Sequence, residues 1–315
     1  MNRLKDTYNK LFKNDTKKII FVYTPPKAGS TTLVTSLRIS LGKSVTVIHL
    51  HDEIMLSVLT GINGIKIVDL IEYVVKKGKQ VFIIDIYRTP IERKISDFFY
   101  KIDSLHFNNN EDISNYSMNR ITKRFNDMFP HLGNEDYLFK LFPNKRGAFN
   151  FNTKYLLESF KNATYVKLRL NDVKDWGNIL SSLLKEKIVI INDCITENMK
   201  LGNLYKTFKS HYKIPINFLE DIKTDIALNF FLNEKEKHTY IQRWNIKKTG
   251  EYLPFTYEQY SFYLRLSLEN QRCAKIEYDH YLDNGCYCDA CLIQRKSIYL
   301  KALKGEKITE RIEHN

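Results

Sequence analysis

Residues 17–33 read KKIIFVYTPPKAGSTTL, and this stretch decides the fold of the region around it. Its apolar run, Ile19–Tyr23, is rich in β-branched and aromatic side chains and predicts a buried strand, which the following Pro25 and Pro26 end. Apolar residues then recur at helical spacing as far as residue 41 and predict a helix; they are Leu33, Val34, Leu37 and Leu41. The stretch therefore predicts a strand, a turn and a helix.

The turn carries the groups that a phosphate needs. A helix N-terminus offers unpaired backbone N–H groups, and Gly29 lets a ligand approach the backbone closely. Lys27 supplies an ammonium, and three hydroxyl side chains follow it, those of Ser30, Thr31 and Thr32. These features predict a phosphate-binding loop; the alternative is a basic strand-to-helix turn that binds no ligand.

A second strand–loop–helix segment follows at residues 80–99. The apolar run Gln80–Tyr87 predicts another strand, and Arg88 stands at its end. Pro90 suits the first turn of a helix, whose apolar residues share one face; they are Ile91, Ile95, Phe98 and Phe99. Ser96 lies eight residues after Arg88. The alternative to a binding role is that Arg88 pairs with an acidic residue and that Ser96 is an ordinary helix residue.

The order of residues in both segments resembles one family of enzymes. The loop departs from the common nucleotide-triphosphatase pattern, GxxxxGK followed by Ser or Thr, because Lys27 precedes Gly29 and no earlier glycine stands in the loop. The order P-K-x-G-S-T-T instead resembles the loop of sulfotransferases that use 3′-phosphoadenosine 5′-phosphosulfate (PAPS). The pattern R-x-P-I-E-R-x-x-S resembles Golgi-type polysaccharide O-sulfotransferases and capsular-polysaccharide sulfotransferases of microbes.

This resemblance implies an activity, a cofactor and a set of residues that bind it. The sulfuryl group would pass in line from PAPS to a hydroxyl of a polysaccharide or other glycan, which leaves adenosine 3′,5′-bisphosphate. Lys27 would neutralise the leaving phosphate oxygen, and no metal is required. The loop would hold the 5′-phosphosulfate and the second segment the 3′-phosphate; the cofactor-binding residues are Lys27, Ala28, Gly29, Ser30, Thr31, Thr32, Arg88 and Ser96.

The catalytic base is sought on the strand predicted over Ser44–His51. The resemblance implies a His or Glu as the base, but not its position. Side chains alternate along a strand, so His49 and His51 share one face near its carboxyl end, where ligands bind in open parallel sheets. An imidazole suits proton transfer at neutral pH. We expect His51 to be the base, then His49, with Asp52 and Glu53 behind; the alternative is that backbone hydrogen bonds hold both histidines in a structural role.

The alternation of strands and helices predicts an α/β fold, a three-layer sandwich with a central parallel sheet of the P-loop-like sulfotransferase type. We expect this core over residues 1–200, with an inserted acceptor region at about 101–152, and a mainly helical extension over 201–315. A strand followed by a helix is expected over Ala163–Trp176 and an edge strand over Ile188–Asn192. Helices are expected over Phe218–Leu232, Glu234–Asn245 and Tyr257–Arg272.

The charge of the chain favours anionic partners. The 315 residues carry 49 Lys and Arg against 36 Asp and Glu, a net charge of +13, which suits a phosphorylated cofactor, an acidic glycan, nucleic acid or an anionic membrane. Two other functions stay open: a nucleotide-dependent kinase with a variant P-loop, and a non-catalytic basic protein that binds nucleic acid or acidic glycan. The sulfotransferase interpretation expects no nucleic-acid partner and leaves the oligomeric state unknown.

The remaining sequence features concern location and metal. The polar N-terminal residues contain no signal peptide, and no apolar run is long enough for a membrane span, so we expect a soluble, cytoplasmic protein of microbial or viral type. In such a compartment unligated thiols, a zinc site or a disulfide are all open interpretations of the cysteines. The candidates are Cys194, Cys273, Cys286, Cys288 and Cys291, with His280 nearby.

Overall fold

The computed structural model describes residues 2–12, 16–100, 102, 117–119, 121–122, 125, 136–144, 147–191, 201–214, 219 and 223–245. These residues form two compact units: residues up to 88 with 136–191 form the first, and residues 89–125 with 201–245 form the second. The predicted boundaries at 1–200 and 201–315 stay a prediction. The five cysteines, His280 and the helix expected over 257–272 lie outside the described residues.

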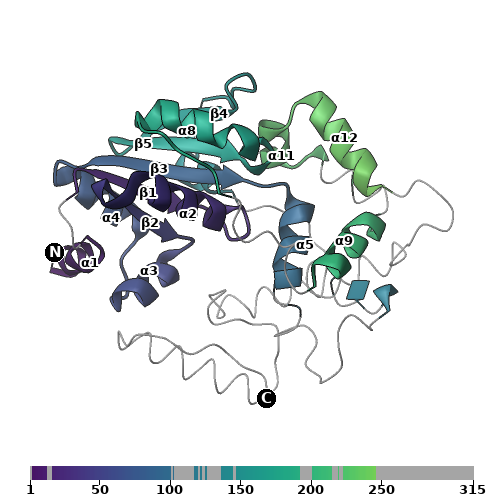
Figure 1. The fold of residues 1–315 in the computed structure, drawn as a ribbon, viewed down its shortest axis with the longest axis horizontal. Coiled ribbons are helices and arrows are strands. Elements are labelled where there is room, and N and C mark those ends of the chain that lie inside the picture. Colours follow the sequence, from purple (N-terminus) through teal and green to yellow (C-terminus); the bar gives the residue numbers. More distant parts are fainter. Residues whose placement is uncertain are drawn as a thin grey trace, which may run out of the picture. The chain divides into compact units, whose positions relative to one another are not determined.

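The first unit is built on a five-stranded sheet with the order β2-β1-β3-β5-β4 (Figure 1). Neighbouring strands pair in parallel, except that β4 runs antiparallel to β5. Phe21 of β1 pairs with Ile48 of β2 and with Ile83 of β3, and β3 continues past its last pair with β1, Val22–Ile84, as far as Tyr87. The strands are β1 (Lys18–Tyr23), β2 (Val45–Leu50), β3 (Gln80–Tyr87), β4 (Tyr155–Phe160) and β5 (Ala163–Arg169).

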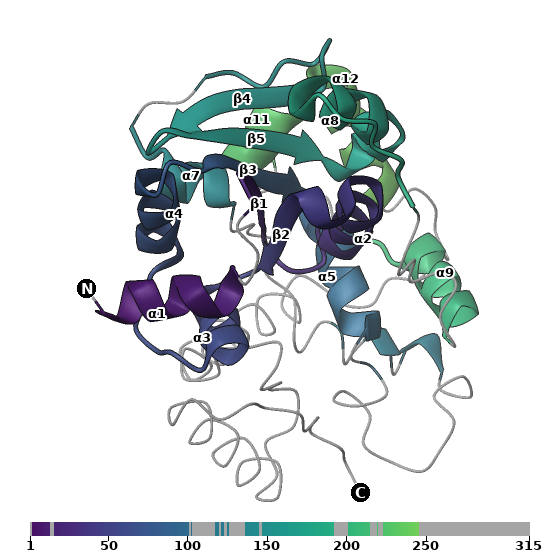
Figure 2. The ribbon, with the colours of Figure 1, turned by 60° about the vertical axis from the view of Figure 1, so that its left-hand side comes forward.

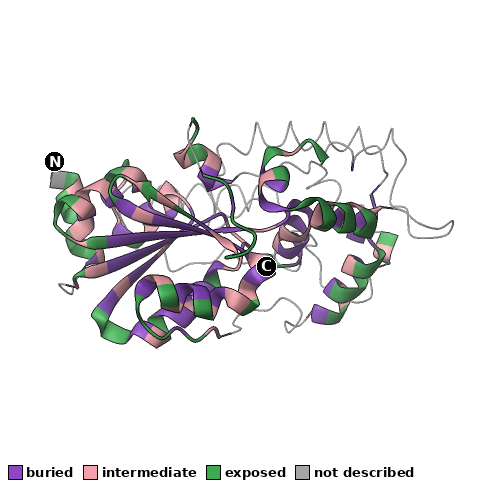
Figure 3. Cartoon of the chain, turned by 90° about the horizontal axis from the view of Figure 1, so that it is seen from above, coloured by how far each residue is buried: buried purple, intermediate pink, exposed green. Residues whose placement is uncertain are grey.

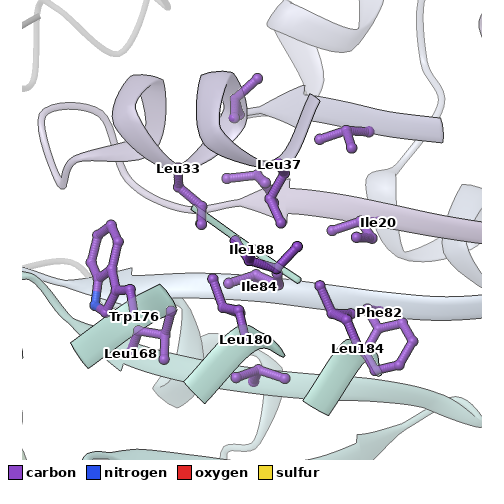
Figure 4. Close-up of a cluster of buried hydrophobic side chains, with 14 of the residues drawn as sticks. Ile20, Leu33, Leu37, Phe82, Ile84, Leu168, Trp176, Leu180, Leu184 and Ile188 are labelled. Atoms are coloured by element: carbon purple, nitrogen blue, oxygen red, sulfur yellow. The ribbon is translucent and has the colours of Figure 1, made fainter. Parts of the chain in front are cut away.

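Helices cover both faces of this sheet (Figure 2). On one face, α2 (Ser30–Leu41) and α8 (Trp176–Leu184) pack on alternate strand residues such as Ile20 and Ile84 (Figure 4). Phe21 points to the other face and meets Phe12, which follows α1, at 6.2 Å between ring centroids. The helices α1 (Asn2–Leu11), α3 (Glu53–Thr60) and α4 (Ile67–Lys76) lie on that side.

The described residues of the first unit also form three short helices: η1 (Gly42–Ser44), α7 (Tyr137–Leu141) and η4 (Leu170–Asp175). The strand residues between the helical layers are mostly buried, while the outer sides of the helices are exposed (Figure 3). This layered arrangement places the loop after β1, the end of β2 and the end of β3 along one edge of the sheet.

The second unit consists of helices around an aromatic core. Those with bounds among the described residues are α5 (Pro90–Tyr100), α9 (Gly202–His211), α11 (Ile226–Phe231) and α12 (Glu234–Trp244). The rings of Phe98 and Phe125 meet at 5.3 Å, and those of Phe208 and Tyr212 stack at 5.1 Å. Aromatic faces and edges attract one another, which supplements the burial of their area.

The predicted α/β class is confirmed, and β3 and α2 run as far as the sequence predicts. The edge strand expected over Ile188–Asn192 is wrong in its described part, residues 188–191, which are not a strand. Serine hydroxyls accept the hydrogen bonds of the amides of Ile188 and Val189 instead, at 2.9 and 3.0 Å. The antiparallel edge is β4, so the sheet is mixed rather than wholly parallel.

Candidate functional site

The loop between β1 and α2 has an unusual backbone. Lys27 has φ of 61° and Gly29, the residue before α2, has φ of 100°. The left-handed region is open to glycine, whereas a lysine there costs on the order of 1 kcal/mol. Such conformations persist only where surrounding contacts hold them, and they occur often at ligand sites. The loop leads into the N-terminus of α2, a helix of twelve residues whose first backbone N–H groups point toward the loop.

Arg88 holds this loop from the neighbouring strand. Its guanidinium Nη1 donates a hydrogen bond of 2.7 Å to the carbonyl oxygen of Lys27, which stands 61 residues earlier. The contact exists because β3 pairs directly with β1, so that the end of β3 lies beside the loop that follows β1. The side chain of Arg88 thus reaches the backbone of Lys27, so these two residues, which the sequence singled out separately, lie at one edge of the sheet.

Gly29 is held closely by a segment that the sequence did not single out as part of the site. A Cβ atom at Gly29 would lie 2.8 Å from Leu170 Cδ1 and 3.4 Å from Trp176 Cη2. Trp176 is fully buried and donates from its indole Nε1 to the carbonyl of Arg169 at 3.0 Å. The end of β5 and the start of α8 therefore form one wall of the loop. The only signal in the sequence is that another strand-to-helix turn occurs there.

The three hydroxyl side chains of the first helical turn point in different directions. Ser30 is buried, Thr31 is exposed and Thr32 is half-buried. Successive residues of a helix are rotated by about 100° from one another. One ligand therefore cannot meet all three hydroxyls in the same way, although the backbone N–H groups of this turn remain directed along the helix axis.

His49 and His51 lie as the sequence predicts, on one face at the carboxyl end of β2. Their rings are 4.6 Å apart at an interplanar angle of 76°. His51 is buried, and its Nδ1 lies 2.6 Å from the carbonyl oxygen of Thr24. A carbonyl only accepts hydrogen bonds, so Nδ1 carries the proton and Nε2 is the basic nitrogen in the neutral ring. The backbone hydrogen bond expected for a structural histidine is present, and it also orients the ring.

Burial lowers the pKa of His51 below its usual value of 6.5. The hydrogen bond to Thr24 raises the pKa, whereas the positive charge of Lys27 lowers it further. The net effect favours the neutral imidazole at pH 7, the form that can accept a proton. The influence of Lys27 also means that the ammonium and the histidine belong to the same neighbourhood of the first unit.

Thr24, which follows β1, joins β2 and β3 at this edge of the sheet. Its buried Oγ1 donates to the carbonyl of Ile86 at 3.1 Å and accepts from the Ile86 amide at 3.0 Å. Its backbone amide donates to the carbonyl of Leu50 at 3.3 Å. The Thr24 hydroxyl thus takes the place of a backbone hydrogen-bond partner for Ile86, at the point where the chain leaves β1 for the loop. Sequence reasoning missed this residue, because a threonine beside two prolines has no distinctive pattern.

The two acidic residues expected behind the histidines have local roles. Asp52 precedes α3 and accepts a hydrogen bond of 2.7 Å from the amide of Met55, which caps the helix. Burial raises the pKa of Asp52. Glu53 is the first residue of α3 and is half-buried. The cap explains why an acidic residue follows the strand without any catalytic requirement.

Ser96 lies in the second unit, buried on α5. Its pairing with Arg88 around one phosphate stays a prediction. In the part of the chain that the structure describes, no group of three or more His, Cys, Asp and Glu side chains is arranged to hold a metal ion. Nor does any helix among the described residues have the length and apolar character of a membrane span.

Comparisons with protein-family models, with curated proteins and with solved structures find no significant match to this chain. The described residues define a protein of the mixed α/β class, with a basic loop at the carboxyl edge of its sheet.

Proposed function

We propose that the protein is a sulfotransferase that moves the sulfuryl group of PAPS to a hydroxyl of a glycan. The observation that carries the proposal is the hydrogen bond from Arg88 to the backbone of Lys27, which brings both cationic motifs to one edge of the sheet. A buried histidine within electrostatic reach of Lys27 supports it. We also propose that the α/β fold is of the P-loop-like sulfotransferase type.

The chemistry assigns one task to each group. The bond between the sulfuryl sulfur and the bridging phosphate oxygen breaks, and a bond from sulfur to the acceptor oxygen forms. Lys27 and the N–H groups of the first turn of α2 stabilise the charge on the departing phosphate. The acceptor's proton passes to Nε2 of His51, the nitrogen left basic by the hydrogen bond of Nδ1 to Thr24. Arg88 binds the 3′-phosphate, for which a guanidinium fork is well suited.

One buried carboxylate argues against the kinase alternative. Asp85 lies on β3, directly beside β1, where an acid that holds Mg²⁺ through water would be sought. Its side chain is fully buried and its Oδ2 lies 2.7 Å from both Lys167 Nζ and Tyr165 Oη. A carboxylate neutralised in this way is a poor ligand for a hydrated magnesium ion.

The proposal predicts which ligand stabilises the folded protein. Adenosine 3′,5′-bisphosphate should raise the midpoint of thermal unfolding without magnesium, because fixed cations and helix N–H groups bind its phosphates. We expect Arg88→Ala to weaken this binding by about 10- to 100-fold, since a hydrogen bond to a charged group contributes roughly 1.5–3 kcal/mol. We expect Lys27→Ala to lower the rate of sulfuryl transfer by about 10²- to 10³-fold.

Two matched variants control for the loss of charge. Arg38 also donates to a backbone carbonyl, that of Val47 at 3.1 Å, and Lys43 is exposed in η1, which follows the carboxyl end of α2. Arg38→Ala and Lys43→Ala should bind the bisphosphate as the unchanged protein does. The proposal fails if Lys27→Ala and Arg88→Ala behave like these controls. Stabilisation by ATP that depends on magnesium would identify a kinase instead.

A further inference from the structure

A group of charged side chains is buried inside the first unit, away from the loop. Lys167 on β5 places its Nζ 2.7 Å from Asp85 Oδ2 and 2.7 Å from Asp136 Oδ2. All three side chains are at most 2% exposed. Tyr165 donates a further hydrogen bond of 2.7 Å to Asp85 Oδ2. We call Asp85, Asp136 and Lys167 the buried ion triad.

A triad of this kind is not explained by stability alone. Removing charges from water costs several kcal/mol per ion, and well-packed apolar residues often stabilise a protein as well or better. The triad also links two elements of the unit: Lys167 on β5 contacts Asp136, the residue that precedes α7. Asp136 Oδ1 accepts a hydrogen bond of 3.0 Å from the amide of Leu138, while Oδ2 faces Lys167.

The helix α7 depends on this anchor. It has five residues, too few to be stable without tertiary contacts. The residue after Asp136 is Tyr137, whose hydroxyl donates to the backbone carbonyl of His51 and whose ring packs against Tyr23 at 4.6 Å. The contacts therefore run from Lys167 to Asp136, then through one peptide unit to Tyr137, and from there to His51.

We propose that the buried ion triad consists of positioning residues for His51, which act through α7 and the Tyr137 hydroxyl. The inference rests on the proposed function only in giving His51 the role of base. Tyr137 holds the His51 carbonyl, and Thr24 holds the ring nitrogen Nδ1. Two hydrogen bonds thus fix the backbone and the imidazole together, which keeps Nε2 in one direction.

The proposal predicts a change in His51 when the Tyr137 hydroxyl is removed. In Tyr137→Phe the ring remains, but the His51 carbonyl loses its donor and water gains access to the site. Because burial is the largest cause of the low pKa of His51, this pKa should rise toward its usual value of 6.5. The other groups beside the ring, His49 and Lys27, are unchanged in the variant.

A second variant tests the triad itself. Asp136→Ser keeps a side-chain oxygen that can cap α7 but is too short to reach Lys167. It should raise the pKa of His51 in the same direction as Tyr137→Phe. Leu180→Ala is the control, because Leu180 is buried on α8 against the opposite face of the sheet. It should lower the stability of the unit and leave His51 unchanged.

The measurement is a pH titration of the imidazole signals of the full-length protein by NMR, which also reports the tautomer. His51 among the eight histidines is assigned by the loss of its signal in His51→Gln. An unchanged pKa and tautomer in Tyr137→Phe would overturn the inference, even if Asp136→Ser failed to fold. The readout uses neither donor nor acceptor. A protein that bound no bisphosphate but showed the shift would refute the proposed function and keep the positioning role.

Discussion

At the scale of single residues, the buried ion triad is the feature with the clearest energetic consequence. Two carboxylates and one ammonium carry a net charge of −1 in an environment that excludes water. One added proton makes the group neutral, and burial accordingly raises the pKa of Asp136 to about 6, although Lys167 acts in the opposite direction. The proton is therefore part of the most stable form of the group below that pH.

Asp136 should make the stability of the protein depend on pH in an unusual direction. Between about pH 4 and pH 6 the folded protein holds a proton that the unfolded chain releases, so the free energy of unfolding falls as the pH rises. The total change is about 3 kcal/mol for a shift of roughly two units. Urea denaturation of the unchanged protein and of Asp136→Asn at several pH values measures it, because the amide does not titrate.

His51 acts in the opposite sense and is present in both proteins. Its pKa is lowered on folding, so the unfolded chain binds the extra proton and stability rises with pH up to about 6.5. Comparing the two proteins in a His51→Gln background removes this contribution, because the pKa of His51 itself is expected to respond to a change at Asp136. Equal pH dependence in both would show that Asp136 keeps an ordinary pKa.

Lys167 should be the least replaceable member of the triad. Lys167→Met leaves two carboxylates buried without a cation, which costs about 3–5 kcal/mol of unfolding free energy. Part of this loss should return at low pH, where the carboxylates are protonated. The midpoint of urea denaturation at pH 5 and pH 7.5 tests this prediction. A loss below about 1 kcal/mol at pH 7.5 would mean that water reaches the site.

At the scale of elements, the loop between β1 and α2 owes its shape to its neighbours. Arg88 at the end of β3 holds the carbonyl of Lys27, Thr24 joins the loop's start to β3, and Leu170 leaves no room for a side chain at Gly29. The strand–turn–helix pattern is visible in the sequence, but these three restraints come from strands that are distant along the chain.

Gly29→Ala should lower the stability of the protein by more than the cost of placing an alanine at positive φ. The added Cβ would lie 2.8 Å from Leu170 Cδ1, and φ at this position is 100°. Gly78→Ala is the control, because Gly78 also has positive φ, 75°, but a Cβ there meets nothing within 4 Å. We expect Gly78→Ala to cost about 1–2 kcal/mol and Gly29→Ala about 1–3 kcal/mol more, with weaker binding of adenosine 3′,5′-bisphosphate.

Denaturant titration and thermal-shift titration measure both quantities for these variants. Leu170→Ala in combination with Gly29→Ala should recover part of the additional loss, because it removes the atom in contact. If the two glycine variants were equally stable and bound the ligand equally well, the close packing of η4 on the loop would have no energetic role.

At the scale of the whole molecule, the net charge of +13 belongs to the complete chain. A positive potential of this size attracts anionic ligands before any specific contact forms, and salt screens it within about 10 Å at 0.1 M ionic strength. The net charge does not determine the reaction, but it predicts which kind of glycan associates faster with the protein.

An acidic glycan should therefore associate faster than a neutral glycan of equal length, and only the acidic one should slow with salt. We expect about a tenfold fall in its association rate between low and physiological ionic strength. Kinetic binding measurements with immobilised protein provide the rates. A salt-independent rate for the acidic glycan would show that the charge is spread too widely to guide it.

What the sequence determined by itself is local. The period of two along residues 45–51 places His49 and His51 on one face, and the helical period after residue 30 defines α2, because neighbouring residues alone set these patterns. The apolar run of residues 80–87 likewise defines β3 and places Arg88 directly after it, because this pattern also depends only on neighbouring residues.

Only the tertiary structure decided which strands are neighbours. The pairing of β3 with β1 brings Arg88 to Lys27, and that of β5 with β3 buries Lys167 against Asp85. The edge strand β4 escaped prediction because its turn to β5, Lys161 and Asn162 with φ of 52° and 64°, lacks the glycine typical of such hairpins. Contacts between distant segments depend on the packing of the whole sheet, and no short stretch of sequence encodes them.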